Sequence, residues 1–171
     1  MRRIGLLSDT HGYLDPKIKK YFSEVDEIWH AGDIGNLQTL EKLEKWKPLR
    51  VVYGNIDDHQ IRASCTEILR FQVEEIQVLM MHIGGRPSKY AKKALEELTK
   101  YNSPQLFICG HSHIALAQFD KRFNMLWLNP GACGYKGFHQ IKTIFRFTID
   151  GKNIENLECI ELGPRVSKIT E

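Results

Sequence analysis

The sequence predicts an α/β fold, and three observations predict it. Apolar runs typical of strands alternate with stretches of helical spacing in the first half of the chain. Short polar segments rich in Asp, His and Gly follow these apolar runs, as they do at the carboxyl ends of strands in α/β sheets. The second half is richer in strand patterns. With 171 residues, of which 42% are hydrophobic, the chain has the size of one domain with its own core.

The first half alternates strand, helix, strand, helix and strand. Pro16 suits the first turn of a helix, and Asp15 before it is the expected N-cap. Leu40 and Leu43 belong to an apolar stripe of helical spacing. Two successive crossovers of this kind favour parallel pairing of the strands. The predicted elements are strands at 3–8, 27–30 and 49–53 and helices at 16–23 and 36–46.

The second half predicts mainly strands. Asp150-Gly151 between two apolar runs is a strong hairpin signal. Ser88 is the expected cap of a single helix at 88–101. The predicted strands are 66–73, 76–81, 105–109, 116–120, 125–128, 143–149 and 154–160. We therefore expect one domain over residues 1–162 and a polar C-terminal tail over residues 163–171.

Composition excludes several classes of protein. Lys and Arg number 24 against 21 Asp and Glu, and no basic stripe is apparent, which argues against a nucleic-acid partner. No apolar run approaches the roughly 18 residues of a membrane span, and we expect no signal peptide. The four cysteines form no C-x-x-C pair, so we expect free buried thiols in a reducing compartment, the cytoplasm.

Residues able to bind metals recur where the predicted strands end. In an open α/β sheet, ligands bind outside the carboxyl ends of the strands, so one edge would collect these side chains. They are oxygen and imidazole donors without a thiolate, which suits Mn²⁺, Fe or Zn²⁺. The candidate metal ligands are Asp9, His11, Asp33, Asn55, His82, His111 and His113. Seven ligands exceed what a single tetrahedral zinc takes, but they suffice for two metals bridged by a carboxylate.

The motifs that carry these ligands resemble those of the calcineurin-like metallophosphoesterases, and within them the small single-domain YfcE-like phosphodiesterases. The order of the motifs along the chain is that of the family, and Asn129-Pro130-Gly131 extends the resemblance downstream. The matching segments are Asp9-Thr10-His11, Gly32-Asp33, Gly54-Asn55-Ile56-Asp57, His82 and Gly110-His111-Ser112-His113.

This resemblance implies a four-layer α/β/β/α sandwich of two mixed sheets and a site for two divalent metal ions. Mn²⁺ is favoured, with Fe, Zn²⁺ or Ni²⁺ as alternatives. By the resemblance, the first metal is held by Asp9, His11 and His113, the second by Asn55, His82 and His111, and Asp33 bridges both. A hydroxide bridging the two metals would attack phosphorus, which gives Asp33, Asn55 and His111 catalytic roles as well.

One position departs from the superfamily pattern. Many members have a His directly after the motif Asn, where this chain has Ile56, which can neither donate a proton nor form a hydrogen bond. We expect weaker expulsion of poor alcohol leaving groups. His59, three residues on, is a candidate substitute because imidazole titrates near neutral pH.

Three further side chains have open interpretations. Arg86 could bind a phosphate through two nitrogens, and an ordinary exposed loop arginine is the alternative. His139, in a glycine-rich loop, could reach the substrate or be an ordinary loop histidine. His30, three residues before Asp33, is expected to orient a ligand or to be structural.

The function predicted from these observations is hydrolysis of a small phosphoester, with phosphodiesters favoured over monoesters. The alternative is a scaffold for protein interaction, because the fold is similar to that of the retromer subunit Vps29, whose metal site is altered. An exposed apolar patch would favour the scaffold, and the retained histidines favour the enzyme. A homodimer is the oligomeric state expected from the general frequency of such assemblies.

Overall fold

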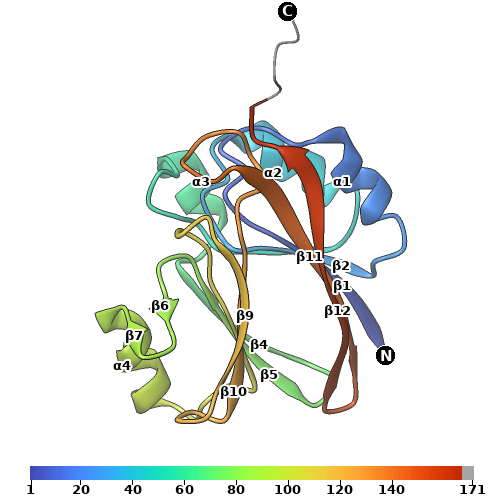
Figure 1. Cartoon of the computed structure of the whole chain (residues 1–171). Helices are drawn as coiled ribbons and strands as arrows, with labels where there is room; N and C mark the ends of the chain where they lie inside the picture. Colours follow the sequence, from blue (N-terminus) through green and yellow to red (C-terminus); the bar gives the residue numbers. More distant parts are fainter. Residues whose placement is uncertain (167–171) are drawn as a thin grey trace, which may run out of the picture.

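The computed structural model describes residues 1–166, and its framework is two five-stranded mixed sheets packed face to face (Figure 1). The first sheet has the order β12-β11-β1-β2-β3. Its parallel strands are β1 (Arg2–Leu7), β2 (Glu27–His30) and β3 (Leu49–Val51), and its antiparallel partners are β11 (Ile141–Asp150) and β12 (Asn153–Pro164). The first three strands are therefore parallel, as the crossovers predict.

The second sheet has the order β4-β5-β8-β10-β9. Its central strands β5 (Ile76–Met81), β8 (Leu106–Ile108) and β10 (Met125–Pro130) are parallel. The outer strands β4 (Ile68–Val73) and β9 (Ala115–Asp120) pair with them in antiparallel fashion. The strand ends that carry the predicted ligands therefore come from two sheets rather than from one, in agreement with the sandwich that the resemblance implies.

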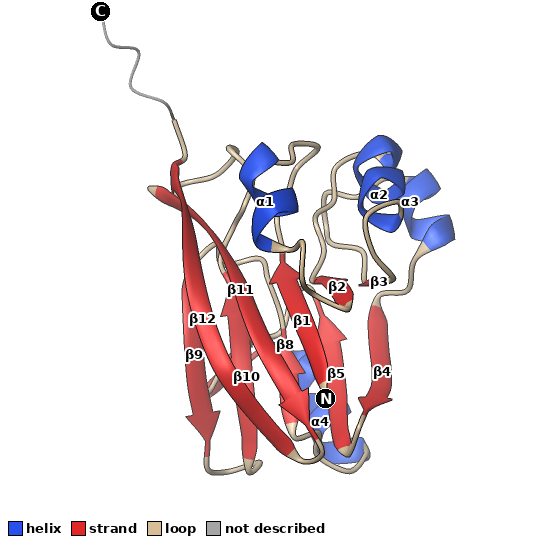
Figure 2. Ribbon diagram, turned by 90° about the vertical axis from the view of Figure 1, so that its right-hand side faces the viewer, coloured by secondary structure: helices blue, strands red, loops and turns tan. Residues whose placement is uncertain are grey.

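Alternation along the strands explains the layers. In β1, Ile4 and Leu6 face the core between the sheets, whereas Leu7 faces outward, because successive side chains point to opposite faces. On the outer face of the first sheet, α1 (Pro16–Tyr21) and α2 (Leu37–Glu44) contribute Ile18 and Leu43 to the cluster around Leu7. Figure 2 shows α1 and α2 near the end of the sheets where β1 terminates.

The outer face of the second sheet is covered by α4 (Lys92–Lys100). Ala94 and Leu98 of this helix pack on Leu79 and Phe107 of the sheet. The remaining helix, α3 (His59–Ser64), packs through Ile61 against Leu40 of α2. The predicted four-layer α/β/β/α architecture is thus confirmed.

Two local predictions are confirmed and two are corrected. Asp15 caps α1 by accepting a hydrogen bond from the backbone N–H of Lys17 (3.0 Å), and Asp150-Gly151 turns β11 into β12. The helix expected at 88–101 begins only at Lys92. Its N-cap is Ala91 rather than the expected Ser88, which lies at positive φ in the turn of a hairpin formed by β6 (Gly85–Arg86) and β7 (Lys89–Tyr90).

The sequence pattern did not predict α3, because its six residues carry too short an apolar stripe. The helix is initiated locally: the Asp58 carboxylate accepts hydrogen bonds from the backbone N–H groups of Gln60 and Ile61, both at 3.0 Å. At the other end of the chain, β12 continues to Pro164, so the polar tail expected over 163–171 overlaps this strand. Residues 167–171 of that tail lie outside the described residues.

Within residues 1–166, no helix is both long and apolar enough to cross a membrane. The four cysteines are free thiols, as predicted. Burial was predicted for all of them and is found for Cys109 and Cys133, whereas Cys65 is half-buried and Cys159 is exposed, because Cys159 lies on the edge strand β12.

Candidate metal centre

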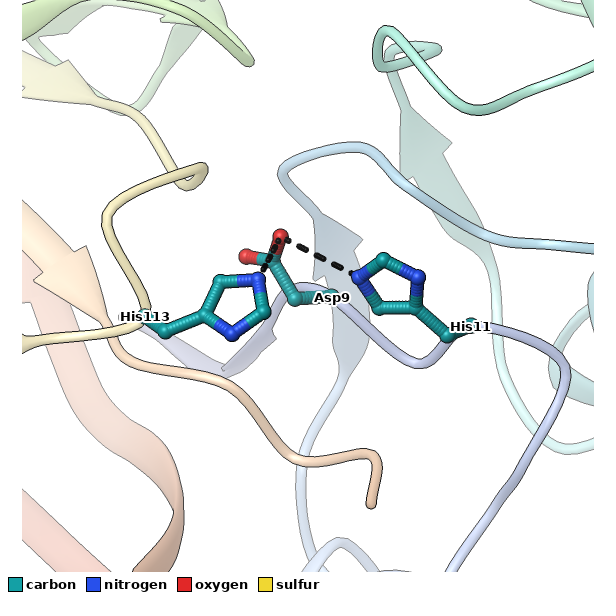
Figure 3. Close-up of side chains that lie close together, drawn as sticks. All are labelled: Asp9, His11 and His113. Carbon is teal, nitrogen blue, oxygen red and sulfur yellow. Dashed lines mark ion pairs between the residues drawn. The ribbon is translucent and has the colours of Figure 1, made fainter. Parts of the chain in front are cut away.

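The loops after β1, β2, β5 and β8 meet at one end of the two sheets. They bring five of the seven predicted ligands into two overlapping groups, in each of which the potential ligand atoms lie within 4.8 Å of one another. The first group is Asp9, His11 and His113, and Figure 3 shows Asp9 and His11 on one loop and His113 on another; the second group is Asp9, Asp33 and His82. Sequence order alone would not have predicted that Asp9 belongs to both groups.

Each carboxylate presents one oxygen to several imidazoles. Asp9 Oδ1 lies 3.1 Å from His113 Nε2, 3.8 Å from His11 Nε2 and 3.9 Å from His82 Nε2. Asp33 Oδ2 lies 3.2 Å from His82 Nε2 and 3.7 Å from His11 Nε2. Asp33 thus approaches a histidine of each group, and both carboxylates lie between the two sets of imidazoles.

The other oxygen of each carboxylate is held by hydrogen bonds. Asp9 Oδ2 accepts from the Ser8 hydroxyl (2.6 Å) and from the His111 backbone N–H (3.2 Å). Asp33 Oδ1 accepts from the Ile56 backbone N–H (3.1 Å). Such outer contacts fix the orientation of ligands before a metal arrives.

A backbone carbonyl fixes the ring of His82 in the same way. Its Nδ1 lies 2.7 Å from the Ala31 carbonyl oxygen, which can only accept a hydrogen bond. The Nδ1 of His82 therefore carries a hydrogen, so a neutral His82 ring presents the lone pair of Nε2 to the centre.

Three polar atoms of the centre are buried without a hydrogen-bond partner among the described residues: Asp9 Oδ1, His11 Nε2 and His82 Nε2. Because buried polar groups are nearly always hydrogen-bonded, each such atom needs an explanation. All three belong to the two groups and point into the same small space. Carboxylate oxygens and imidazole nitrogens are the donors that divalent transition metals take. The residues present therefore fit a divalent metal ion.

The backbone at the centre is strained. Five predicted ligands have positive φ angles, a conformation that costs a residue other than glycine of order 1–3 kcal/mol. These residues are Asp9 (56°), His11 (48°), Asp33 (57°), His111 (69°) and His113 (59°). Such strain persists only where the surrounding structure imposes it, and it clusters at functional sites.

The charges of the centre are coupled. Burial by itself would raise the pKa of Asp9, but its contacts with His11 and His113 hold that pKa well below the usual value. Burial would likewise raise the pKa of Asp33, and the contact with His82 lowers it. Both carboxylates are therefore ionised, and they give a buried centre that attracts cations.

Asn55 and His111, the other two predicted ligands, are exposed at the edge of the centre. Asn55 lines a hollow of about 350 Å³ together with His82. The His111 ring lies edge-on to the His82 ring, with 5.3 Å between centroids, and burial lowers the pKa of His111, which favours the neutral form that binds metals.

Two further histidines, His30 and His139, contact the loops that carry the predicted ligands. His30 Nδ1 accepts from the Gly32 N–H (3.1 Å), its Nε2 lies 2.9 Å from Thr10 Oγ1, and burial lowers its pKa to about 3. His30 therefore stays neutral and ties together the loops that carry Asp9 and Asp33. His139 is buried, with its Nδ1 3.2 Å from His113 Nδ1.

Comparison with known proteins places the chain in a family. The sequence model described as the calcineurin-like phosphoesterase superfamily domain matches residues 1–152. The chain belongs to this superfamily. A probable metallophosphoesterase of Methanocaldococcus jannaschii is 30% identical over 163 residues, which cover 92% of this chain and 81% of that protein.

Solved structures share the superfamily fold. A conserved uncharacterized protein of Streptococcus pneumoniae, a predicted phosphoesterase, superposes with a TM-score of 0.70 at 23% identity and covers 94% of this chain and 89% of its own. Wild-type Vps29 of Entamoeba histolytica complexed with Zn²⁺ superposes with a TM-score of 0.70 at 14% identity and covers 96% and 99%. At these identities the likeness concerns the fold alone.

The position that departs from the superfamily motif lies beside the centre. Ile56 is 45% exposed, and its backbone N–H donates to the predicted ligand Asp33. Asp57 accepts hydrogen bonds from Gly35 N–H and Gly54 N–H, both at 2.8 Å, so both of its oxygens serve the loops. His59 is exposed at the first position of α3. Its role in catalysis stays a prediction.

Proposed function

We propose that this chain is a phosphoesterase that depends on two divalent metal ions and prefers phosphodiesters. The observation that carries the proposal is the set of buried, unpartnered donor atoms on Asp9, His11 and His82. A bound divalent metal ion would satisfy these atoms, and a centre that binds such ions is what a metal-dependent phosphoesterase requires.

The ligand sets follow the two groups and the residues at their edge. Asp9, His11 and His113 would hold one ion, Asn55, His82 and His111 the other, and Asp33 would serve both. When bound, such ions acidify a water molecule and neutralise charge on the transferring phosphoryl group. Mn²⁺ is our first choice, with Fe, Zn²⁺ or Ni²⁺ as alternatives, because all suit oxygen and imidazole donors.

Two hollows beside the centre support a diester preference. One, of about 350 Å³, is bordered by Asn55 and His82. The other, of about 260 Å³, is bordered by His111 and Arg86. A phosphodiester carries two organic groups on phosphorus, and each hollow could receive one of them. Arg86 would bind a phosphate oxygen at the entrance of the second hollow.

The residues at positions 56 and 57 are poorly suited to protonate a leaving group. Ile56 has no proton to donate, and Asp57 is occupied by backbone N–H groups. His59 is the titratable side chain that we propose as a substitute. Without efficient protonation, the enzyme would turn over esters with acidic leaving groups fastest.

The diester preference predicts a difference between two matched substrates that share one leaving group. With Mn²⁺ present, we expect kcat/KM for bis(p-nitrophenyl) phosphate to exceed that for p-nitrophenyl phosphate by at least about tenfold, a difference of about 1.4 kcal/mol in transition-state binding. Initial rates of p-nitrophenolate release measure both. Equal rates, or a faster monoester, would contradict the preference while leaving the metal dependence intact.

A scaffold for protein interaction is the second candidate. Ile114 and Leu116 are apolar, exposed beside and on the edge strand β9, and both border the second hollow, and exposed apolar residues at a sheet edge can bind a partner. Metal-loaded, folded protein that hydrolyses neither ester would favour this alternative. The free thiols support the cytoplasm as the place of action for either function.

A further inference from the structure

One histidine outside the predicted ligand set contacts a ligand directly. His139 lies in the loop between β10 and β11 and is 8% exposed. Its Nδ1 lies 3.2 Å from Nδ1 of His113, and its Nε2 lies 2.9 Å from the carbonyl oxygen of Gly134. The His139 ring therefore bridges a backbone carbonyl and a candidate metal ligand.

The positions of the hydrogens follow from these partners. The Gly134 carbonyl can only accept, so His139 Nε2 carries a hydrogen and donates it. A neutral His139 then has a lone pair on Nδ1, which must accept from Nδ1–H of His113. With its hydrogen on Nδ1, a neutral His113 ring presents the lone pair of Nε2 to a metal ion, and this Nε2 lies 3.1 Å from Asp9 Oδ1.

We infer that His139 is a positioning residue that holds His113 in the orientation and tautomer that bind a metal ion. The inference rests on the proposed function, in which His113 is a metal ligand. It resembles the arrangement at His82, where the Ala31 carbonyl accepts from Nδ1–H directly. At His113 a second imidazole stands between the ligand and the carbonyl.

The loop around His139 is shaped for this contact. A Cβ at Gly137, whose φ is +124°, would overlap the His113 ring, so only glycine lets the loop approach so closely. Phe138 stacks on the His113 ring with 5.5 Å between centroids and 11° between planes. Arg165 Nε donates to the His139 carbonyl oxygen (2.9 Å) and anchors the loop to the end of β12.

The direct test is the tautomer of His113 in the metal-free protein. Imidazole ¹⁵N chemical shifts, assigned with a His113→Gln variant, report which ring nitrogen carries the hydrogen. We expect Nδ1 of His113 to carry a hydrogen, since Nδ1 of His139 accepts it. In His139→Leu, which fills the space without hydrogen bonds, we expect this signature to be lost. A His113 ring in the wild-type protein that carries no hydrogen on Nδ1 would overturn the inference, even if His139→Leu failed to fold.

Metal affinity gives the second readout, measured with Mn²⁺ alone by competition with a coloured chelator. His139→Leu should bind about 10–100-fold more weakly, the usual cost of losing an outer partner of a ligand. His139→Gln should keep most of the affinity, because its amide can accept from His113 and donate to Gly134. Gln140→Leu, at the exposed neighbouring position, should bind as wild type does.

Two results keep this inference distinct from the proposed function. Wild-type affinity in His139→Leu would overturn the inference while the proposed function stands. If no divalent ion binds the wild-type protein, the proposed function fails, and the inference that His113 is held for metal binding fails with it. The position of the hydrogen on His113 in the metal-free protein would then show whether this ring is wrongly oriented for a metal ion or whether another part of the centre prevents binding.

Discussion

Asp9→Asn should abolish high-affinity binding of divalent cations. Asp9 Oδ1 belongs to both ligand groups and lies within 3.9 Å of three imidazole nitrogens. The change removes the negative charge but keeps the shape of the side chain. We expect affinity to fall by more than about 100-fold, the upper end of the cost of losing only an outer partner of a ligand.

A thermal shift measures this loss without any substrate. Mn²⁺ at about 100 times its Kd should stabilise the wild-type protein by about 2.7 kcal/mol. For a domain of this size that corresponds to a rise in Tm of about 5–11 °C. Asp9→Asn should show a rise of no more than about 1–2 °C, and the control Asp150→Asn, at an exposed turn, should show the full rise. A normal shift in Asp9→Asn would show that Asp9 is not a metal ligand.

Gly54→Ala should damage the centre through a single methyl group. A Cβ at Gly54 would overlap the Oδ1 and the backbone nitrogen of Asp33. The alanine must push Asp33 away and break its hydrogen bond from the Ile56 N–H. We expect a loss of about 1–3 kcal/mol in unfolding free energy from overpacking. Mn²⁺ affinity should also fall, because Asp33 leaves its place beside His82.

A control at a second glycine, Gly5, separates the loss of stability caused by overpacking from the loss of metal affinity. A Cβ at Gly5 would lie 2.8 Å from the Phe22 ring, in the core under α1 and far along β1 from the ligands. Gly5→Ala should therefore lose similar stability in a urea titration but retain the metal-induced rise in Tm. Equal metal affinity in Gly54→Ala and the wild-type protein would contradict the role given to Asp33.

The sequence predicts the fold well because its signals are local. The N-cap at Asp15 and the turn at Asp150-Gly151 depend on neighbours along the chain, and both are found. The helix expected at 88–101 starts late because the β6–β7 hairpin takes up Gly85–Tyr90. That pairing depends on where the fold places the loop, and the spacing of apolar residues along the sequence does not predict this position.

The identity of the candidate ligands could be predicted, whereas their arrangement could not. The motifs name Asp9 and Asp33, but nothing in the sequence places Asp9 in both groups. The sequence leaves His139 as either a substrate contact or an ordinary loop histidine, and it does not predict the contact with His113, because the two residues lie 26 positions apart in the sequence. A glycine directly before Phe138 and His139 is the only local hint that a loop approaches something closely.

The most direct test of the account is hydrolysis of bis(p-nitrophenyl) phosphate by metal-stripped protein, before and after Mn²⁺ is added back. Asp33→Asn is assayed alongside, because this change keeps the shape of a residue that lies close to His11 and His82. The leaving group is activated, so the absence of a proton donor at Ile56 should matter little. Circular dichroism checks that both proteins are folded.

We expect turnover that needs Mn²⁺, saturates with added metal and is lost in Asp33→Asn. Fe²⁺, Zn²⁺ and Ni²⁺ are tried in parallel, since each fits the donor atoms present. Turnover that persists without metal, or that survives in Asp33→Asn, would contradict a metal-dependent reaction at this centre. Folded protein with no turnover under any of these metals would contradict the phosphodiesterase activity itself.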